Sequence, residues 1–242
     1  MGESAWARCR AALRRARLPK PPWWAALGCA AVFALLLLTD EQTRRACDVL
    51  FEILPLRFAG YFLSELVDYP LLVAAVVLLA AFGGRDGRRA AAALVVALVA
   101  QAICVEVLRD IAGRARPMVS GGATEFLGPA LGVPGHDSLP SGHAATAFAL
   151  AVVVGAYWPR GRGAVFCFAV AVALARIVVR AHFWADVFLG SAIGLYCGWL
   201  AVVNVAPLRG GELAALSRPR QGPEKGKRDE ADIAQRKEHG QN

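Results

Sequence analysis

Long apolar stretches, separated by short polar segments, dominate the pattern of hydrophobic and polar residues along this chain. Six such stretches lie at residues 23–39, 67–82, 90–108, 142–158, 164–179 and 183–206. They contain 16 to 24 residues, and a helix that rises about 1.5 Å per residue needs about 20 residues to cross the hydrocarbon core of a membrane. The pattern therefore predicts an all-α integral membrane protein with six transmembrane helices.

The segment between the first two stretches, residues 40–66, is amphipathic. Its apolar residues recur at helical spacing, interrupted at Pro55, and are Val49, Leu50, Ile53, Leu54, Phe58, Phe62, Leu63 and Leu66. This spacing predicts one or two helices that lie on the outer membrane surface. A lid that packs on the helix bundle is the alternative, and the pattern leaves both open.

Composition agrees with a membrane location. Of the 242 residues, 57% are hydrophobic and the mean hydropathy is +0.45, which exceeds what a soluble domain of this length needs for one core. The basic start followed by an apolar stretch is similar to a secretory signal peptide. However, the charged residues Asp40 and Glu41 follow without a small-residue cleavage site, so we expect this stretch to remain as the first helix.

The positive charges indicate how the helices are oriented. The net charge is +8, and 19 of the 27 lysine and arginine residues lie in residues 1–22, 83–89, 159–163 and 207–242. Since basic residues accumulate on the cytoplasmic side, both termini are predicted to be cytoplasmic. We therefore expect a basic cytoplasmic arm (1–22), a six-helix membrane domain (23–206) and a disordered cytoplasmic tail (207–242). The surplus charge favours anionic lipid headgroups as partners and gives no reason to expect nucleic acid.

Most polar residues that interrupt the apolar stretches fall at the outer face of this topology. They are Arg109, Arg114, Arg116, His136, Asp137, Ser141, His143, Arg176, Arg180, His182 and Asp186. Ionisable residues at membrane depth are costly and usually mark a functional site. A transporter or channel would instead place such residues across the whole bilayer.

Three of the arginines have the chemistry of a phosphate site. Arg109, Arg116 and Arg176 would repel one another unless they shared an anion, and guanidinium groups bind phosphate oxygens in pairs. Pro140 is expected at the first position of the fourth helix, which would leave the amides of Ser141 and Gly142 free to bind an anion at the positive end of the helix dipole.

Two histidines complete the candidate chemistry. His182 and Asp186 are four residues apart, so in a helix the carboxylate could fix the imidazole tautomer of a nucleophile. His143 could protonate a leaving oxygen as a general acid. No acidic cluster suited to Mg²⁺ occurs, and the six cysteines are scattered without a C-x-x-C pair, so we predict no metal and no cofactor.

Each of these residues also has a structural interpretation. Arg180 is expected to be an interfacial anchor, and Glu106 is expected to orient Arg109. We expect Arg114 and His136 to be solvated or to support the site without reacting. His182 and Asp186 taken alone could be a structural pair. A catalytic role is favoured only because they occur together with the other candidate site residues at this spacing.

Three motifs carry a resemblance to a known family. RDIAGRARP (109–117), PSGH (140–143) and RIVVRAHFWAD (176–186) resemble the three-block signature of the type 2 phosphatidic-acid phosphatase superfamily in order and spacing. The resemblance implies that His182 forms a phosphohistidine intermediate with help from Asp186, and that His143 protonates the leaving group. It also implies metal-free chemistry, with the phosphate held by five residues: Arg109, Arg116, Ser141, Gly142 and Arg176.

Two positions depart from the family pattern. Arg109 stands where lysine usually opens the first block, which keeps the charge but changes its geometry. Ala175 stands where a serine commonly precedes the arginine of the third block, and the lost hydroxyl contact would weaken phosphate binding by about 1 kcal/mol.

The resemblance implies a metal-independent membrane lipid phosphatase with its active site on the periplasmic face of a bacterial inner membrane. The candidate substrates are undecaprenyl pyrophosphate, lipid A phosphate, phosphatidylglycerol phosphate and phosphatidic acid, and the compact architecture slightly favours the first two. A lipid phosphotransferase with the same site is the alternative. A vanadate-dependent haloperoxidase shares the motifs, but six apolar stretches argue against it. The sequence does not indicate an oligomeric state.

Overall fold

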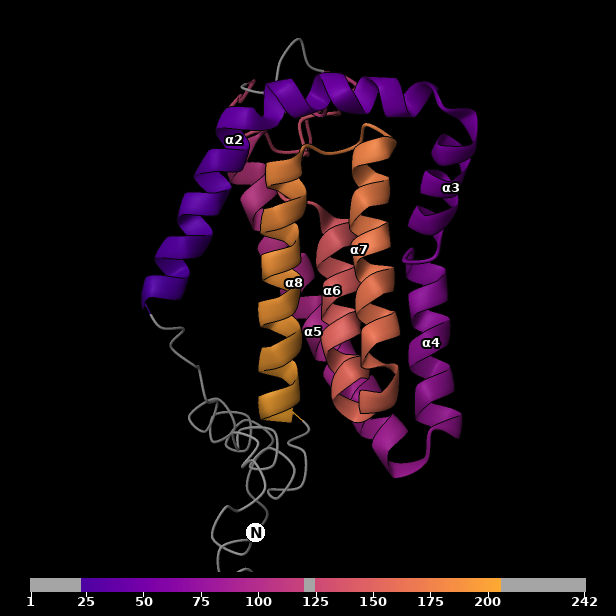
Figure 1. The fold of residues 1–242 in the computed structure, drawn as a ribbon. Helices are drawn as coiled ribbons and strands as arrows, with labels where there is room; N and C mark the ends of the chain where they lie inside the picture. Colours follow the sequence, from indigo (N-terminus) through magenta and orange to yellow (C-terminus); the bar gives the residue numbers. More distant parts are fainter. Residues whose placement is uncertain (1–22, 120–124, 206–242) are drawn as a thin grey trace, which may run out of the picture. The chain divides into compact units, whose positions relative to one another are not determined.

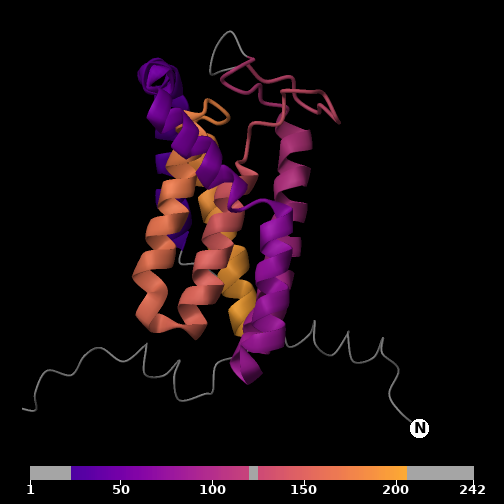
Figure 2. The ribbon, with the colours of Figure 1, turned by 90° about the vertical axis from the view of Figure 1, so that its right-hand side faces the viewer.

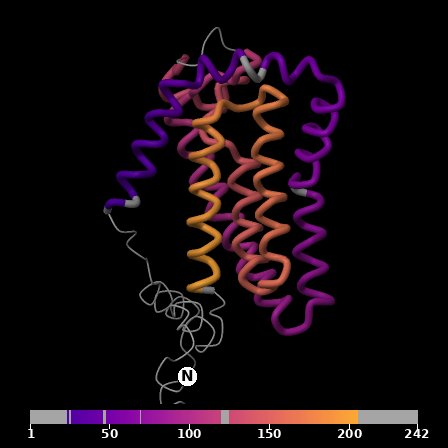
Figure 3. Tube along the Cα trace, in the orientation of Figure 1, coloured from indigo at the N-terminus to yellow at the C-terminus, as the bar shows by residue number. Residues whose placement is uncertain are grey.

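A computed structural model of the chain describes residues 23–119 and 125–205 (Figure 3). The predicted basic arm (1–22) and cytoplasmic tail (207–242) lie outside the described residues. The helices are α2 (Trp23–Glu52), α3 (Leu54–Glu65), α4 (Tyr69–Phe82), α5 (Gly84–Ala112), α6 (Gly142–Tyr157), the short 3-10 helix η1 (Pro159–Gly161), α7 (Arg162–Val178) and α8 (Trp184–Val205). Within the described ranges there is no strand, and the only β-type pairing is an isolated bridge between Arg114 and Phe126, so the all-α prediction is confirmed.

Several of these helices have the length and composition of membrane spans. Four helical segments qualify alone: 26–52 in α2, all of α5, 159–178 over η1 and α7, and 184–204 in α8. The segments 54–65 and 70–82, which meet at 48°, could together form a fifth span, and α6 is apolar but has only 16 residues. The structure therefore supports an integral membrane protein with four to five candidate spans among the described residues, while six spans stay a prediction.

The first predicted helix continues further than its apolar pattern suggested. The apolar stretch ends near Thr39, yet α2 runs without a break to Glu52. In Figures 1 and 2, the first part of α2 lies outside the bundle, and its second part passes over one end of the bundle toward α3. Ion pairs between Arg44 and both Glu41 and Asp48 stabilise this charged part of the helix. The predicted break is present, because α2 ends one residue before Ile53 and Pro55 lies in the first turn of α3.

Helix α6 forms the centre of the bundle and packs against α5, α7 and α8. Its buried face consists largely of alanines, which allow neighbouring helices to approach closely. Three glycines of α8, four residues apart, face it: Gly190, Gly194 and Gly198. A Cβ atom at Gly190 would collide with the backbone of Ser141, and one at Gly194 with the backbone of Ala145. This backbone contact places the start of α6 beside the start of α8.

Candidate functional site

The predicted site residues come together at one end of the bundle, where α5 and α7 end and α6 and α8 begin. Arg109 lies in the last turn of α5, Ser141 to His143 open α6, Arg176 lies in the last turn of α7, and Asp186 lies in the first turn of α8. The loop between α5 and α6 adds Arg116, and the turn between α7 and α8 adds His182. The three motifs, far apart in sequence, therefore form one cluster.

A tight turn positions the His182 imidazole. Arg180 adopts a left-handed conformation with φ of 59°, which reverses the chain after α7, and the amides of Ala181 and His182 then donate to the carbonyl of Arg176. His182 is only 2% exposed, and its Nδ1 lies 2.8 Å from the carbonyl oxygen of Ser138. Because a carbonyl can only accept, Nδ1 carries the proton and Nε2 keeps its lone pair. The ring therefore has the tautomer of a nucleophile.

The surroundings also keep this imidazole uncharged. Burial, followed by the positive charges of Arg176, Arg116 and Arg109, lowers the pKa of His182 well below its ordinary value of 6.5. A neutral imidazole beside three guanidinium groups can attack an anion that those groups hold.

Asp186 supports His182 in a different way from the one predicted. Because α8 begins only at Trp184, the two residues are not on one helical face, and the Asp186 Oδ2 lies 4.0 Å from Nδ1 of His182. The expectation that Asp186 fixes the tautomer is wrong in this structure, since the backbone of Ser138 does so. The carboxylate instead accepts hydrogen bonds from Ser138 Oγ at 2.5 Å and from the amide of Phe183 at 2.9 Å, and so anchors the segments on both sides of the imidazole.

Arg114 connects Asp186 to α2. Its Nη1 donates to Asp186 at 2.6 Å and its Nη2 donates to Asp40 at 2.9 Å, and all three side chains are buried. The guanidinium also lies 4.2 Å from the ring centre of Phe183. A solvated Arg114 is therefore wrong, and a supporting role is consistent with the structure. Sequence reasoning missed Asp40, although a carboxylate at the end of an apolar stretch was a signal that could have found it.

Two predicted phosphate-binding arginines each pair with a carboxylate. Arg109 Nη1 donates to Glu106 at 2.7 Å, which confirms that Glu106 orients it. Arg116 donates through two nitrogens to Asp137, at 2.8 and 2.6 Å. Burial alone would raise the pKa of Asp137, but the hydrogen bond and charge of Arg116 outweigh it, so the pKa is lowered and the carboxylate stays charged.

The third arginine and the general-acid candidate have partners on α3 and on the turn before α4. Arg176 is buried and donates from Nη1 to Ser64 Oγ at 2.8 Å. His143 Nε2 lies 3.2 Å from Oδ1 of Asp68, which precedes α4. Neither Ser64 nor Asp68 was identified from the sequence, because nothing in their local pattern connects them to residues more than 70 positions away.

The helix start differs in detail from the expected anion seat. Helix α6 begins at Gly142, so Ser141 caps it and Pro140 precedes the helix instead of opening it. The amide of Ser141 is not free, because it donates to the carbonyl of Asp186 at 3.0 Å. A Cβ atom at Gly142 would lie 2.9 Å from Nη2 of Arg109, so the glycine lets this guanidinium approach the helix start.

The remaining candidates lie at the edge of the cluster. Arg180 Nε lies 2.9 Å from Oδ1 of Asp48 in α2, so the predicted interfacial anchor pairs with the helix that covers the site. His136 lies in the loop, 3.9 Å from Glu125, and lines the open polar pocket beside Arg109 and Asp137.

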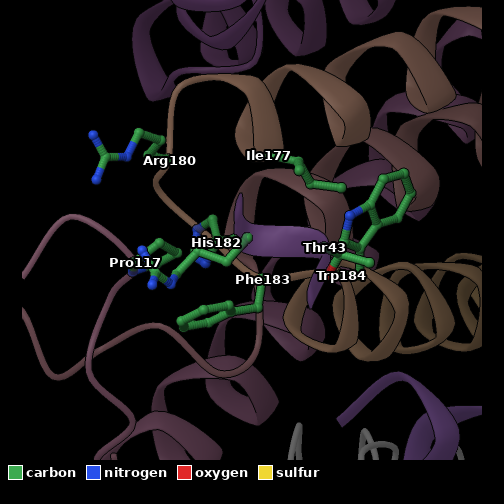
Figure 4. A pocket seen from close by; sticks show the side chains of 8 residues that line it. Thr43, Pro117, Ile177, Arg180, His182, Phe183 and Trp184 are labelled. Atoms are coloured by element: carbon green, nitrogen blue, oxygen red, sulfur yellow. The ribbon is translucent and has the colours of Figure 1, made fainter. Parts of the chain in front are cut away.

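Two hollows adjoin the cluster. His182 borders a cavity of about 10 Å³, shown in Figure 4 with Pro117, Phe183 and Trp184 among its lining residues. This cavity has room for about one water molecule. A more open, polar pocket of about 260 Å³ is lined by loop residues together with Glu106, Arg109 and Asp137. Across the described ranges, no three histidine, cysteine or acidic side chains are grouped as metal ligands.

Comparisons with known proteins agree with the motifs. The family model of the PAP2 superfamily matches residues 90–209. Over 109 residues the chain is 32% identical to a lipid A 1-phosphatase of Rhizobium etli, and this match covers 44% of the chain and 45% of the length of that protein.

Two solved structures are also similar to this one. LpxE of Aquifex aeolicus superposes with a TM-score of 0.54 at 23% identity, over 66% of this chain and 93% of the other. A PAP2-type phosphatidylglycerolphosphate phosphatase from Bacillus subtilis superposes with a TM-score of 0.48 at 17% identity, over 81% of this chain and 98% of the other. The similarity to LpxE supports the helical fold described above.

Proposed function

Because residues 90–209 of this chain belong to the PAP2 superfamily, we propose that the protein is a membrane lipid phosphatase that uses His182 as its nucleophile. One observation carries this proposal. The buried imidazole of His182 donates from Nδ1 to the Ser138 carbonyl, and thus presents an unprotonated Nε2 beside three arginines.

In the first step, Nε2 of His182 attacks the phosphorus of the lipid phosphate. The bond to the lipid oxygen breaks as the new N–P bond forms, and His143 donates a proton to the departing oxygen. Arg109, Arg116 and Arg176, with the helix start at Ser141 and Gly142, hold the phosphoryl oxygens and stabilise their charge. The products are a phosphohistidine and the dephosphorylated lipid.

In the second step, a water molecule attacks the phosphohistidine. His143, now neutral, accepts a proton from this water, and the N–P bond breaks to release phosphate and restore His182. Every step uses side chains of this chain and needs no metal ion. Asp186 and Arg114 position the loop that holds the imidazole and do not touch the phosphate in this scheme.

The proposed site lies at one end of a six-span bundle, on the periplasmic side of a bacterial inner membrane, with both termini in the cytoplasm. The similarity to a lipid A 1-phosphatase favours a lipid A phosphate over undecaprenyl pyrophosphate, phosphatidylglycerol phosphate and phosphatidic acid as the substrate. The match spans 45% of the length of that relative.

Phosphate release from these four lipids by the purified protein in detergent, with EDTA present, tests the proposal. Wild type should release phosphate from at least one lipid and show a phosphoenzyme on an alkaline gel, where phosphohistidine survives. His182→Ala should lose at least about 10³-fold in rate and leave no such phosphoenzyme. His136→Ala is the matched control, since this histidine lines only the open pocket and takes no part in the proposed steps, and it should keep most of the wild-type rate. Unchanged turnover in His182→Ala would overturn the nucleophile, and loss of wild-type activity in EDTA would overturn metal independence.

A further inference from the structure

An apolar groove of about 420 Å³ lies between α4 and α5, with α6 behind it. Eight of its ten lining residues are alanine, leucine or valine. Val73 and Val77 of α4 and Val99 of α5 line it and are largely exposed, so the groove opens on the outer surface of the bundle. In a membrane that surface faces lipid, and the groove is a place where a hydrocarbon chain can lie between two helices.

The groove begins directly beneath the candidate general acid. Thr146, which lines it, follows His143 by three residues on α6, and Leu72, which also lines it, follows Asp68 by four residues. His143 and Asp68 are in contact at 3.2 Å. At a rise of about 1.5 Å per residue, the groove therefore starts about 5 Å below the atoms that meet the leaving group. The occupant that this continuity indicates is a chain of the lipid whose phosphate is bound above.

Two polar side chains lie in this otherwise apolar groove. Gln101 of α5 is 6% exposed, and its Nε2 donates to Oγ1 of Thr146 at 3.2 Å. The other amide atom of Gln101, Oε1, is buried and has no hydrogen-bond partner among the described residues. A buried amide oxygen without a donor is costly inside a membrane, and such groups usually mark a ligand or a pathway.

Building on the phosphatase function proposed above, we propose that Gln101 is a specificity-determining residue that recognises a hydrogen-bond donor on the lipid chain in the groove. The donor is a hydroxyl or amide N–H within the first few carbon atoms of the chain, because Thr146 and Gln101 lie about one helical turn below His143. An acyl chain with a hydroxyl near its carboxyl end satisfies the free oxygen. An isoprenoid chain or an unsubstituted acyl chain leaves it unpaired, so the groove selects hydroxylated or amide-linked acyl lipids.

Two synthetic diacyl glucosamine 1-phosphates that differ only in the 3-hydroxyl groups of their chains test this proposal. Binding is measured on His182→Ala protein, which binds without turnover, so the result does not depend on the proposed catalysis. We expect the hydroxylated lipid to bind about tenfold more tightly, and Gln101→Met to reduce this preference to less than about twofold. Val96→Met places the same side chain on the exposed side of α5, outside the groove, and should keep the full preference.

The same two lipids are then offered to the enzyme with His182 intact, and kcat/KM is measured. Equal affinity for both lipids, no affinity for either, or a preference that survives in Gln101→Met would overturn the role of Gln101. A binding preference without phosphate release would instead overturn the phosphatase function and leave the groove assignment standing. Size-exclusion elution of Gln101→Met like that of Val96→Met shows that its altered preference does not come from unfolding.

Discussion

Nδ1 of His182 lies 2.8 Å from the carbonyl oxygen of Ser138 and 4.0 Å from the nearest carboxylate oxygen of Asp186. The backbone of the α5–α6 loop thus holds the tautomer of the imidazole, while the carboxylate holds the loop. In many histidine-dependent sites one aspartate both fixes the tautomer of the imidazole and holds the ring in place. Here the Ser138 carbonyl does the first and Asp186 contributes to the second.

Substitutions at Asp186 and Ser138 separate these roles. Asp186→Asn should keep the tautomer and lower kcat by about 10²-fold, well short of the roughly 10⁴-fold loss that follows a wrong tautomer. Ser138→Ala removes the 2.5 Å hydrogen bond to Asp186 but keeps the carbonyl, so we expect a loss of about tenfold or less. Steady-state kinetics on one lipid measures both, and a 10⁴-fold loss in Asp186→Asn would indicate direct pairing with His182.

Arg114 should be needed for stability more than for chemistry. Arg114→Met leaves the buried carboxylates of Asp40 and Asp186 without their shared cation, and we expect it to lower the free energy of unfolding by about 3–5 kcal/mol. Adding Asp40→Asn should recover part of this loss, because it removes one of the two charges. Thermal unfolding in detergent measures the effect, and an Arg114→Met protein that unfolds at the wild-type temperature would contradict it.

Asp68 should matter only when the leaving group needs a proton. Asp68→Asn removes the negative charge 3.2 Å from His143 Nε2, so the imidazolium loses stabilisation and kcat on a lipid phosphate should fall about tenfold. An activated aryl phosphate, whose leaving group departs without protonation, should release its first equivalent of aryl product at nearly the wild-type rate, because that step does not use His143 as an acid. Glu65→Gln, at an exposed neighbouring position, is the control and should affect neither substrate. Equal losses on both substrates would assign Asp68 a structural role alone.

The buried imidazole also predicts how stability depends on pH. The pKa of His182 is lowered by burial and by Arg176, Arg116 and Arg109, so below pH 6.5 the unfolded chain takes up a proton that the folded chain does not. The stability from this group is complete above pH 6.5 and falls as the pH decreases. Between pH 7.5 and pH 5.5 the Tm of the wild type should therefore fall further than the Tm of His182→Gln. His136→Gln is the control. Parallel losses in wild type and His182→Gln would refute this account.

The sequence predicted much of the site because spacing and charge are local properties. The three motifs identify the two histidines and three arginines, and the structure brings these residues to one end of the bundle. The same patterns could not reveal Asp40, Ser64 or Asp68, whose contacts with the motifs depend on how α2, α3 and α4 pack. The sequence predicted helix in residues 40–66 but missed its continuity with the first helix, because charged residues interrupt the apolar pattern after Thr39 and ion pairs stabilise α2 there.

The glycines of α8 have a consequence for how the enzyme can move. Gly190 and Gly194 bring the backbones of α6 and α8 into direct contact, and the Ser141 amide is hydrogen-bonded to the Asp186 carbonyl. If either helix slid along the other, residues with a side chain would replace the glycines at the contact. Even a side chain as small as that of alanine would then collide with the backbone of α6. The distance between the general acid and the nucleophile is therefore set by rigid main chain. Any closure around a bound lipid must come from the parts that touch the site through side chains, namely α2 and α3, so lipid entry and chemistry are assigned to different parts of the protein.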